Sequence, residues 1–277
     1  MTAQTPLGGP GRPVGANTVL FSPLPVADAF AQLARCGYDG VELAAIRGMC
    51  EHLDLGRWQE QVAEIRDLSE QHGLGLLSME EGRLDPEQLE PGLAAAEALG
   101  IPLVNVGPGG KSDEPGALES TIDKLKVGAK MAADHGVTLC VKAHVGAAMY
   151  NTQTTLAVLD AIDDPAFGID YDPSHIMRAG EDPAEALRAI VGRARHIHIR
   201  DCPAGVQGPG PIAQQACGRG VIDLRAVCDV IVASDYQGPV VLEVIGAKPD
   251  NPVTDLVSVA AETRGYLAAA FAGARAS

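Results

Sequence analysis

Histidine, lysine and carboxylate side chains recur at the ends of four short apolar runs in the second half of the chain. The residues concerned are Lys142, His144, Asp172, His175, His198, Arg200 and Glu243. Imidazole and carboxylate groups are ligand types for zinc, manganese, iron and cobalt, and a mixed nitrogen and oxygen shell leaves room for substrate oxygens. Taken one at a time, such residues are as typical of structural hydrogen bonds and turns. Their shared placement therefore indicates one divalent-metal site.

A pair of histidines stands two residues apart in the third of these runs. In a strand, His196 and His198 lie on the same face. His198 is nearer the C-terminal end, so we expect it to be the ligand and His196 to lie deeper or to support the site. Arg200 continues this face and is expected to hold a substrate oxygen, or else to pair with Asp201 or Glu243.

The elements that would gather these residues are read from hydrophobic periodicity. Apolar runs of strand length alternate with segments of helical period, which is typical of repeated βα units. The expected strands are Asn17–Ser22, Gly40–Ala44, Gly75–Met79, Leu103–Gly107, Thr138–Ala143, Phe167–Tyr171, His196–Arg200 and Val240–Ile245. The expected helices include Val26–Cys36, Trp58–His72, Pro86–Leu99, Leu118–His135, Pro183–Val191 and Leu224–Ser234. Several of these end at a glycine suited to a left-handed cap, as at Gly37, Gly73, Gly100 and Gly136.

Eight such units predict a single (β/α)8 TIM barrel over residues 15–273, preceded by a flexible N-terminal segment, residues 1–14. The length of 277 residues and the 46% hydrophobic content suit one barrel of about 250 residues. An open doubly wound sheet is the alternative, but no glycine-rich phosphate motif follows the first strand. In a barrel, the C-terminal strand ends form the catalytic face, so the polar residues above are predicted to share one pocket.

Composition excludes several classes of function. The net charge of -15, with no run among the 21 basic residues, argues against a nucleic-acid partner. No stretch of eighteen apolar residues and no signal-peptide pattern appears, which predicts a cytoplasmic protein without a membrane span. Six cysteines lack paired spacing, so neither a zinc ribbon nor a disulfide framework is indicated. The oligomeric state stays open, a homo-oligomer included.

A long Gly- and Pro-rich stretch, Cys202–Gly220, follows the seventh expected strand. Long loops in compact domains are usually functional or disordered. In a barrel this one would lie at the catalytic mouth. Two interpretations stay open: a lid that covers the substrate, and an insertion with no role in binding.

Five motifs, in this order, resemble those of the sugar phosphate isomerase/epimerase family, the xylose isomerase-like TIM barrels that include inosose dehydratases. They are GYDGVEL at 37–43, GIDYDPSHIMRAGEDP at 168–183, RHIHIRDC at 195–202, GRGVID at 218–223 and YQGPVVLEV at 236–244. The resemblance implies a divalent metal held by Glu, Asp, His and Glu at the ends of strands five to eight. Asp172, His198 and Glu243 match three of these ligands, and His175 matches a substrate-binding His.

The fourth ligand does not match, because Lys142 stands where the family has Glu. A protonated amine cannot bind a metal ion and repels one. Three outcomes are open: His144 supplies the missing ligand, the ion is held by three protein ligands and water, or the ammonium replaces the ion. In the first two cases Lys142 is a candidate base; in the third it polarises a carbonyl or forms a Schiff base. A structural ion pair with Glu243 or Asp172 is the plain alternative.

The resemblance predicts an isomerase or epimerase that acts on a small ketose, sugar or cyclitol. It would abstract a proton next to a carbonyl with the help of manganese, zinc, cobalt or iron. The expected catalytic residues are Glu243, Lys142 and His144. The expected metal ligands are Asp172, His198, Glu243 and His144, and the expected substrate-binding residues are His175, Arg200, Glu42 and Glu80 or Glu81. Two alternatives are a dehydratase or lyase of the inosose dehydratase type, using Lys142 or His144, and a catalytically inactive sugar-binding barrel. The lack of a basic cluster favours an unphosphorylated substrate.

Overall fold

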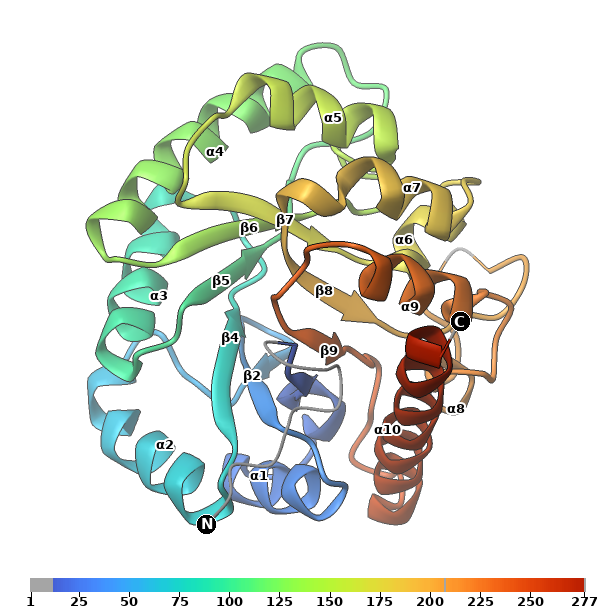
Figure 1. Cartoon of the computed structure of the whole chain (residues 1–277). Coiled ribbons are helices and arrows are strands. Elements are labelled where there is room, and N and C mark those ends of the chain that lie inside the picture. The colour runs from blue at the N-terminus through green and yellow to red at the C-terminus, as the bar shows by residue number, and fades with distance from the viewer. Residues whose placement is uncertain (1–11, 207, 277) are drawn as a thin grey trace.

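Eight parallel strands close into a barrel in the computed structural model, which describes residues 12–206 and 208–276 (Figure 1). They are β1 (Val14–Asn17), β2 (Gly40–Ile46), β4 (Gly75–Glu80), β5 (Leu103–Val106), β6 (Thr138–Lys142), β7 (Phe167–Tyr171), β8 (Ala194–Ile199) and β9 (Val240–Leu242). Each strand pairs with its neighbour in the chain, and β1 pairs with both β2 and β9, which closes the ring. A short strand, β3 (Cys50–Glu51), pairs antiparallel with the end of β2. The predicted single (β/α)8 barrel is confirmed.

Helices surround the barrel on its outer side (Figure 1). They are α1 (Val26–Arg35), α2 (Trp58–His72), α3 (Pro86–Leu99), α4 (Ala117–Asp134), α5 (Thr152–Ala161), α6 (Pro173–Arg178), α7 (Pro183–Ile190), α8 (Ile212–Gln215), α9 (Leu224–Ala233) and α10 (Val253–Ala276). In α1 the buried residues Val26, Ala29, Phe30 and Leu33 recur at helical spacing. Gly73 and Gly100 end α2 and α3 with φ of 63° and 70°, as the sequence predicts.

The first predicted strand, Asn17–Ser22, is wrong in its position. The strand is Val14–Asn17, and Thr18–Phe21 forms a 3-10 helix instead. The Asn17 side chain accepts a hydrogen bond from the Val19 amide at 2.9 Å and so caps this helix. Both segments are buried, and a short apolar run has no periodicity that separates a strand from a buried helical turn. The expected N-terminal segment, residues 1–14, lies outside the described residues except for its last three positions, and Val14 begins β1.

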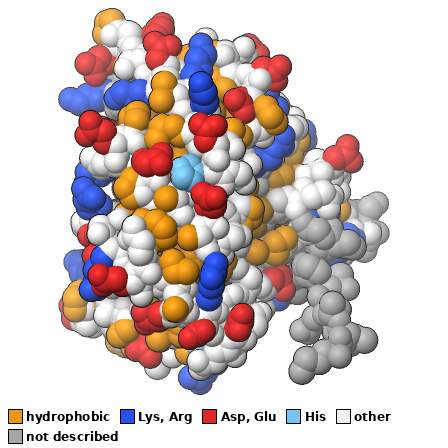
Figure 2. Space-filling view, turned by 90° about the vertical axis from the view of Figure 1, so that its left-hand side faces the viewer, with side chains coloured by type: hydrophobic (Ala, Val, Ile, Leu, Met, Phe, Trp, Pro, Cys, Tyr) orange, Lys and Arg blue, Asp and Glu red, His pale blue; other side chains and the backbone are white. Residues whose placement is uncertain are grey.

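Parallel strands covered on both sides are buried along their whole length, and β7 is an example with all five residues buried. Its alternation turns Asp170 toward the barrel interior, where it contacts His196 from β8. None of the described helices is both long and apolar enough to cross a membrane. On the face shown in Figure 2, Lys and Arg side chains are scattered among Asp, Glu and hydrophobic ones, so this face has no continuous basic surface.

Candidate active site

Polar side chains fill the barrel interior in two layers. The deeper layer is formed by Glu42, Ser78, Asp170, His196 and His198, and all five residues have no measurable exposure. The upper layer is formed by Glu80, Lys142 and Glu243, whose side chains are 8%, 6% and 5% exposed. Since only the upper layer contacts solvent, it is the part of the interior that a substrate reaches first.

In the deeper layer, His198 is held between two carboxylates. Its Nε2 bonds to Glu42, and its Nδ1 lies 2.8 Å from Oδ2 of Asp170. Burial alone would favour the neutral ring, but the charges of Asp170 and Glu42 raise the pKa of His198 well above its usual value. His198 is therefore an imidazolium, and neither ring nitrogen has a lone pair for a metal ion. His196 supports this layer by bridging Asp170 and Ser78, with both contacts at 2.9 Å.

In the upper layer, the ammonium of Lys142 joins two glutamates. Its Nζ lies 2.9 Å from Oε1 of Glu80, 2.7 Å from Oε1 of Glu243 and 3.3 Å from Nδ1 of His198. Burial alone would lower the pKa of Lys142, but the charges of Glu243 and Glu80 raise it well above its usual value. Lys142 is therefore protonated, and as an ammonium it is not a nucleophile for a Schiff base.

The two glutamates on this ammonium differ in protonation. Burial and the neighbouring charge of Glu243 raise the pKa of Glu80 to about 8. The pKa of Glu243 is lowered well below its usual range, because Lys142, His198 and Arg200 together outweigh the opposing effect of burial. Near neutral pH, Glu243 is then ionised while Glu80 holds a proton, which gives the site a base and an acid side by side.

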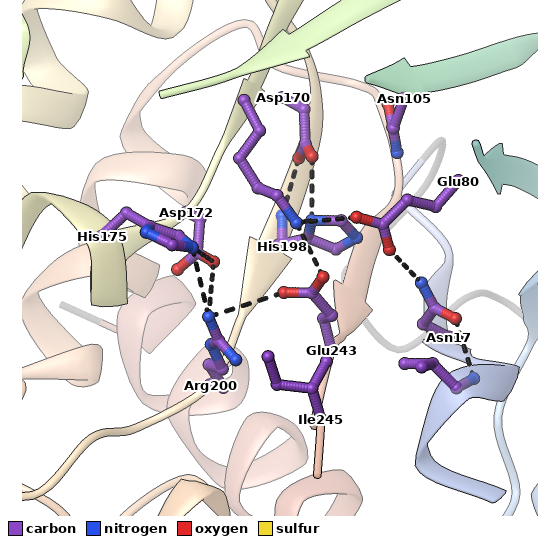
Figure 3. A network of polar contacts seen from close by, with 12 residues as sticks. Asn17, Glu80, Asn105, Asp170, Asp172, His175, His198, Arg200, Glu243 and Ile245 are labelled. Atoms are coloured by element: carbon purple, nitrogen blue, oxygen red, sulfur yellow. Dashed lines mark hydrogen bonds and ion pairs between the residues drawn. The ribbon is translucent and has the colours of Figure 1, made fainter. Parts of the chain in front are cut away.

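Two asparagines that sequence reasoning missed hold the carboxylates in place (Figure 3). Asn17 Nδ2 donates to Oε2 of Glu42 and to Oε2 of Glu80, at 2.7 Å each, and Asn105 Nδ2 also donates to Glu42. The available signal was a single polar residue in each of two short strands, at the end of β1 and inside β5. Glu42 is fully buried and bonded to His198, Asn17 and Asn105, so it lies in the deeper layer, below Lys142 and Glu243.

A second cluster forms around Arg200 on the other side of Glu243 (Figure 3). Its guanidinium contacts Ser174 Oγ at 2.9 Å, Gln215 Oε1 at 3.3 Å and Asp172 Oδ2 at 3.5 Å. Its Nη2 lies 3.7 Å from Oε2 of Glu243. Asp172 also caps α6 through the Ser174 amide, and the charge of Arg200 lowers its pKa although burial opposes this. Asp172 thus pairs with arginine.

Two histidines lie together beside this cluster, His175 buried and His144 exposed. The rings of His144 and His175 are 4.0 Å apart between centroids. His175 Nδ1 accepts the Val145 amide at 3.2 Å, and burial lowers the pKa of both rings, so both are neutral. His144 is exposed, and its Nδ1 lies 3.0 Å from the Val145 carbonyl oxygen.

The structure therefore divides the expected site residues into groups. The first group contains Lys142, Glu80, Glu243 and His198, whose side chains contact one another. A second group lies beside it and contains Asp172, His175 and Arg200. His144 is exposed at the edge of the site, and Glu42 is buried in the deeper layer. Glu81 is directed away from the barrel interior, because its Cγ lies 3.5 Å from the position of a Cβ built on Gly92 of α3. Of the two alternatives Glu80 and Glu81, Glu80 is the residue whose side chain lies in the barrel interior, on Lys142. The residues that sequence reasoning missed are Asn17, Ser78, Asn105, Asp170, Ser174 and Gln215.

A divalent metal does not fit the residues present. Two groups of ligand atoms lie close enough together among the described residues: Glu42 with His196 and His198, and Glu80 with His198 and Glu243. The expected set of Asp172, His198, Glu243 and His144 is neither of them. The ammonium of Lys142 occupies the second group, and the nitrogens of His198, which both groups need, face carboxylates.

Residues 30–266 match the family model described as the xylose isomerase-like TIM barrel. The chain belongs to this family. The resemblance read from the sequence motifs is thereby confirmed. Proteins similar to this xylose isomerase-like barrel include enzymes named as epimerases and dehydratases.

Inosose dehydratase of Clostridium botulinum (strain Alaska E43 / Type E3) is 23% identical over 167 residues, which cover 56% of this chain and 54% of the relative. The match to this enzyme thus spans about half of its length. D-allulose 3-epimerase from Methylomonas sp., solved in complex with D-allulose, shares the fold with a TM-score of 0.74 at 20% identity, over 92% of this chain and 96% of that one. A xylose isomerase-like TIM barrel protein from Mycobacterium smegmatis, solved in complex with magnesium, has a TM-score of 0.74 at 18% identity, over 95% and 97%.

Proposed function

We propose that this barrel is a sugar isomerase or epimerase that moves a proton next to the carbonyl of a small ketose, sugar or cyclitol. The observation that carries the proposal is the pair Glu80 and Glu243 on one ammonium, with their pKa values moved in opposite directions. Proton transfer to and from carbon needs an ionised base and a protonated acid at the same pH.

Glu243 is the base in this proposal. Its Oε1 is held by Lys142, while its buried Oε2 has no hydrogen-bond partner among the described residues. A buried polar atom without a partner is costly, and a substrate C–H would lie against it. Lys142, on Oε1, and Arg200, 3.7 Å from Oε2, place positive charge beside this carboxylate, where it would stabilise the enediolate that forms when the proton leaves.

Glu80 is the acid: it gives its own proton to the enediolate, while Glu243 keeps the proton that it took. Donation to the opposite face of the same carbon gives an epimer, and donation to the neighbouring carbon, with a proton passing between the two oxygens, gives an isomer. The D-allulose 3-epimerase with the same fold supports a small ketose as the substrate class. The neutral ring of His144, which is exposed, would bind a substrate hydroxyl group, with the neutral ring of His175 packed beside it.

Dehydration is the second candidate, and the proton on Glu80 favours it as well. The same enediolate can lose a β-hydroxyl group if an acid protonates the leaving oxygen, and the relatives named inosose dehydratase support this outcome. An inactive sugar-binding barrel would have no need of a matched base and acid, so we favour an enzyme.

Proton exchange in D2O tests the proposal whichever product is formed. A panel of ketoses, aldoses and cyclitol ketones is incubated with the protein, with and without added manganese, and followed by NMR. We expect deuterium at the carbon next to the carbonyl of at least one substrate, and the accompanying product separates epimer, isomer and dehydrated compound.

Two variants make the exchange experiment specific. Glu243→Gln should lower the exchange rate by about a hundredfold or more, as removal of a general base does. Glu81→Gln changes a buried glutamate that faces away from the pocket and should leave the rate unchanged. Binding of a sugar by the wild type without exchange at any carbon, across the whole panel, would favour the sugar-binding barrel instead.

A further inference from the structure

The cluster of Glu80, His198 and Glu243 has the composition of a metal site, with one ligand atom from each within 4.8 Å of the others, yet a side chain of the same protein occupies it. We propose that the ammonium of Lys142 is the resident cation of this barrel, and that the protein binds its substrate without a divalent metal.

The contact distances support this assignment. Nζ of Lys142 lies 2.9 Å from Glu80 and 2.7 Å from Glu243, which are hydrogen-bond lengths. A metal ion bonded to the same two oxygens at about 2.0–2.2 Å would have to lie almost on the nitrogen. An ion can therefore enter only if the ammonium leaves both carboxylates.

The position of the lysine in the fold opposes such a departure. Lys142 is the last residue of β6 and is paired in register with Asp170 of β7, so its backbone is fixed by the barrel. Its side chain is 6% exposed and runs inside the barrel. Leaving the two glutamates would strand them together, ionised or protonated, in a buried site.

Positive or hydrogen-bonding side chains already lie beside the carboxylates around the cluster. Arg200 pairs with Asp172 and lies near Glu243, and the two ring nitrogens of His198 face the deeper carboxylates Glu42 and Asp170. A divalent ion would add two positive charges to an interior that already contains Lys142 and Arg200.

The ammonium also has one more hydrogen-bond donor than its two ion pairs use. An ammonium has three N–H donors, and two of them are used by Glu80 and Glu243. The third lies near His198, whose two nitrogens face carboxylates and so offer it no acceptor. In this proposal the third N–H binds the carbonyl oxygen of a substrate, a role that rests on the proposed function.

Metal binding tests the proposal independently of activity. Wild-type protein purified without chelator is analysed by elemental mass spectrometry, and manganese binding is measured by calorimetry and by the shift in melting temperature. We expect substoichiometric metal, no binding heat and no thermal shift with manganese, zinc or magnesium. Lys142→Glu should bind manganese at least about a hundredfold more tightly than the wild type, because it replaces the ammonium by a carboxylate ligand.

Lys130→Glu is the matched control, since Lys130 is exposed on α4 and the same charge change there should leave metal affinity unchanged. One ion per chain in the wild type, retained in Lys130→Glu and lost in Glu243→Gln, would overturn the proposal. The metal content of the wild type tests the proposal even if Lys142→Glu does not fold. The measurement also needs no substrate. Failure here is therefore distinct from failure of the exchange experiment.

Discussion

The ammonium nitrogen of Lys142 lies 2.7 Å from Oε1 of Glu243, and this contact crosses the barrel interior from the end of β6 to the end of β9. The strands β7 and β8 lie between these two in the sheet. Together with the bond to Glu80 at the end of β4, the ammonium ties three separate strand ends at the catalytic face. The ammonium thus holds these strand ends together and also supplies positive charge to the candidate site.

Removal of this charge should be costly unless a carboxylate is removed with it. We expect Lys142→Met to lower the free energy of unfolding by about 3 kcal/mol, because the ionised, buried Glu243 loses its nearest cation. In the double variant Lys142→Met/Glu243→Gln, part of this loss should be recovered, since the ionised carboxylate is removed together with its cation. Urea denaturation of the wild type, both single variants and the double variant measures the coupling. Simple additivity of the two single effects would contradict the interpretation.

Arg200 should not be replaceable by lysine. Its planar guanidinium contacts Ser174, Gln215 and Asp172 at once, and a lysine keeps the charge but not this geometry. Arg200→Lys should lower kcat/KM in the exchange assay by about ten- to a hundredfold, as the loss of a charged hydrogen bond does. Arg219→Lys is the control, because Arg219 pairs with Glu262 at the surface. Equal kinetics for Arg200→Lys and the wild type would remove Arg200 from the site.

The loop Cys202–Gly220 is anchored at both ends by one carboxylate. Asp201 accepts the Cys202 and Ile222 amides at 2.9 and 3.0 Å through Oδ1, and the Gly218 amide at 3.0 Å through Oδ2. Asp201→Ala should therefore make the segment sensitive to limited proteolysis, while Asp229→Ala on the exposed side of α9 should not. If the loop is a lid, an active substrate will protect it in the wild type; cleavage that no ligand slows would favour an insertion without a role in binding.

The barrel was predictable because its signal is repeated. Eight alternations of apolar strand and amphipathic helix are consistent with one another, and the predicted α2 and α3 have the observed bounds. The first strand was misplaced because the decision depended on a single side chain. Asn17 ends β1 and caps the 3-10 helix, and a run such as NTVLFS is apolar enough for either structure.

The candidate site was predictable only in part. The rule that chemistry lies at strand ends found Lys142, His198 and Glu243, because it needs the order of the strands and nothing more. It could not show that His198 is held between Glu42 and Asp170, since these come from β2 and β7 and meet only through the register and tilt of the closed barrel. Whether a ring nitrogen or a carboxylate oxygen is available to a ligand depends on such partners. These partners are distant in the sequence, so no local pattern predicts them.

Glu81 provides a pH-dependent prediction outside the pocket. Burial raises its pKa from about 4.5 to about 7, although the Arg83 amide opposes this. The folded protein therefore keeps Glu81 protonated up to about pH 7, while the unfolded chain loses this proton near pH 4.5. This contribution to the free energy of unfolding is complete below pH 4.5 and is lost as the pH rises to about 7. The wild type is therefore least stable, with respect to this group, above pH 7.

Glu81→Gln removes this titration and keeps an oxygen acceptor for the Arg83 amide. Relative to the wild type, we expect the variant to gain nothing at pH 4.5 and up to about 3 kcal/mol at pH 8, from 1.36 kcal/mol per pKa unit. Chemical denaturation at several pH values measures the difference, and Glu64→Gln, at an exposed site on α2, controls for the loss of one negative charge. A gain that is the same at pH 4.5 and pH 8 would show that packing, and not the buried charge, accounts for it.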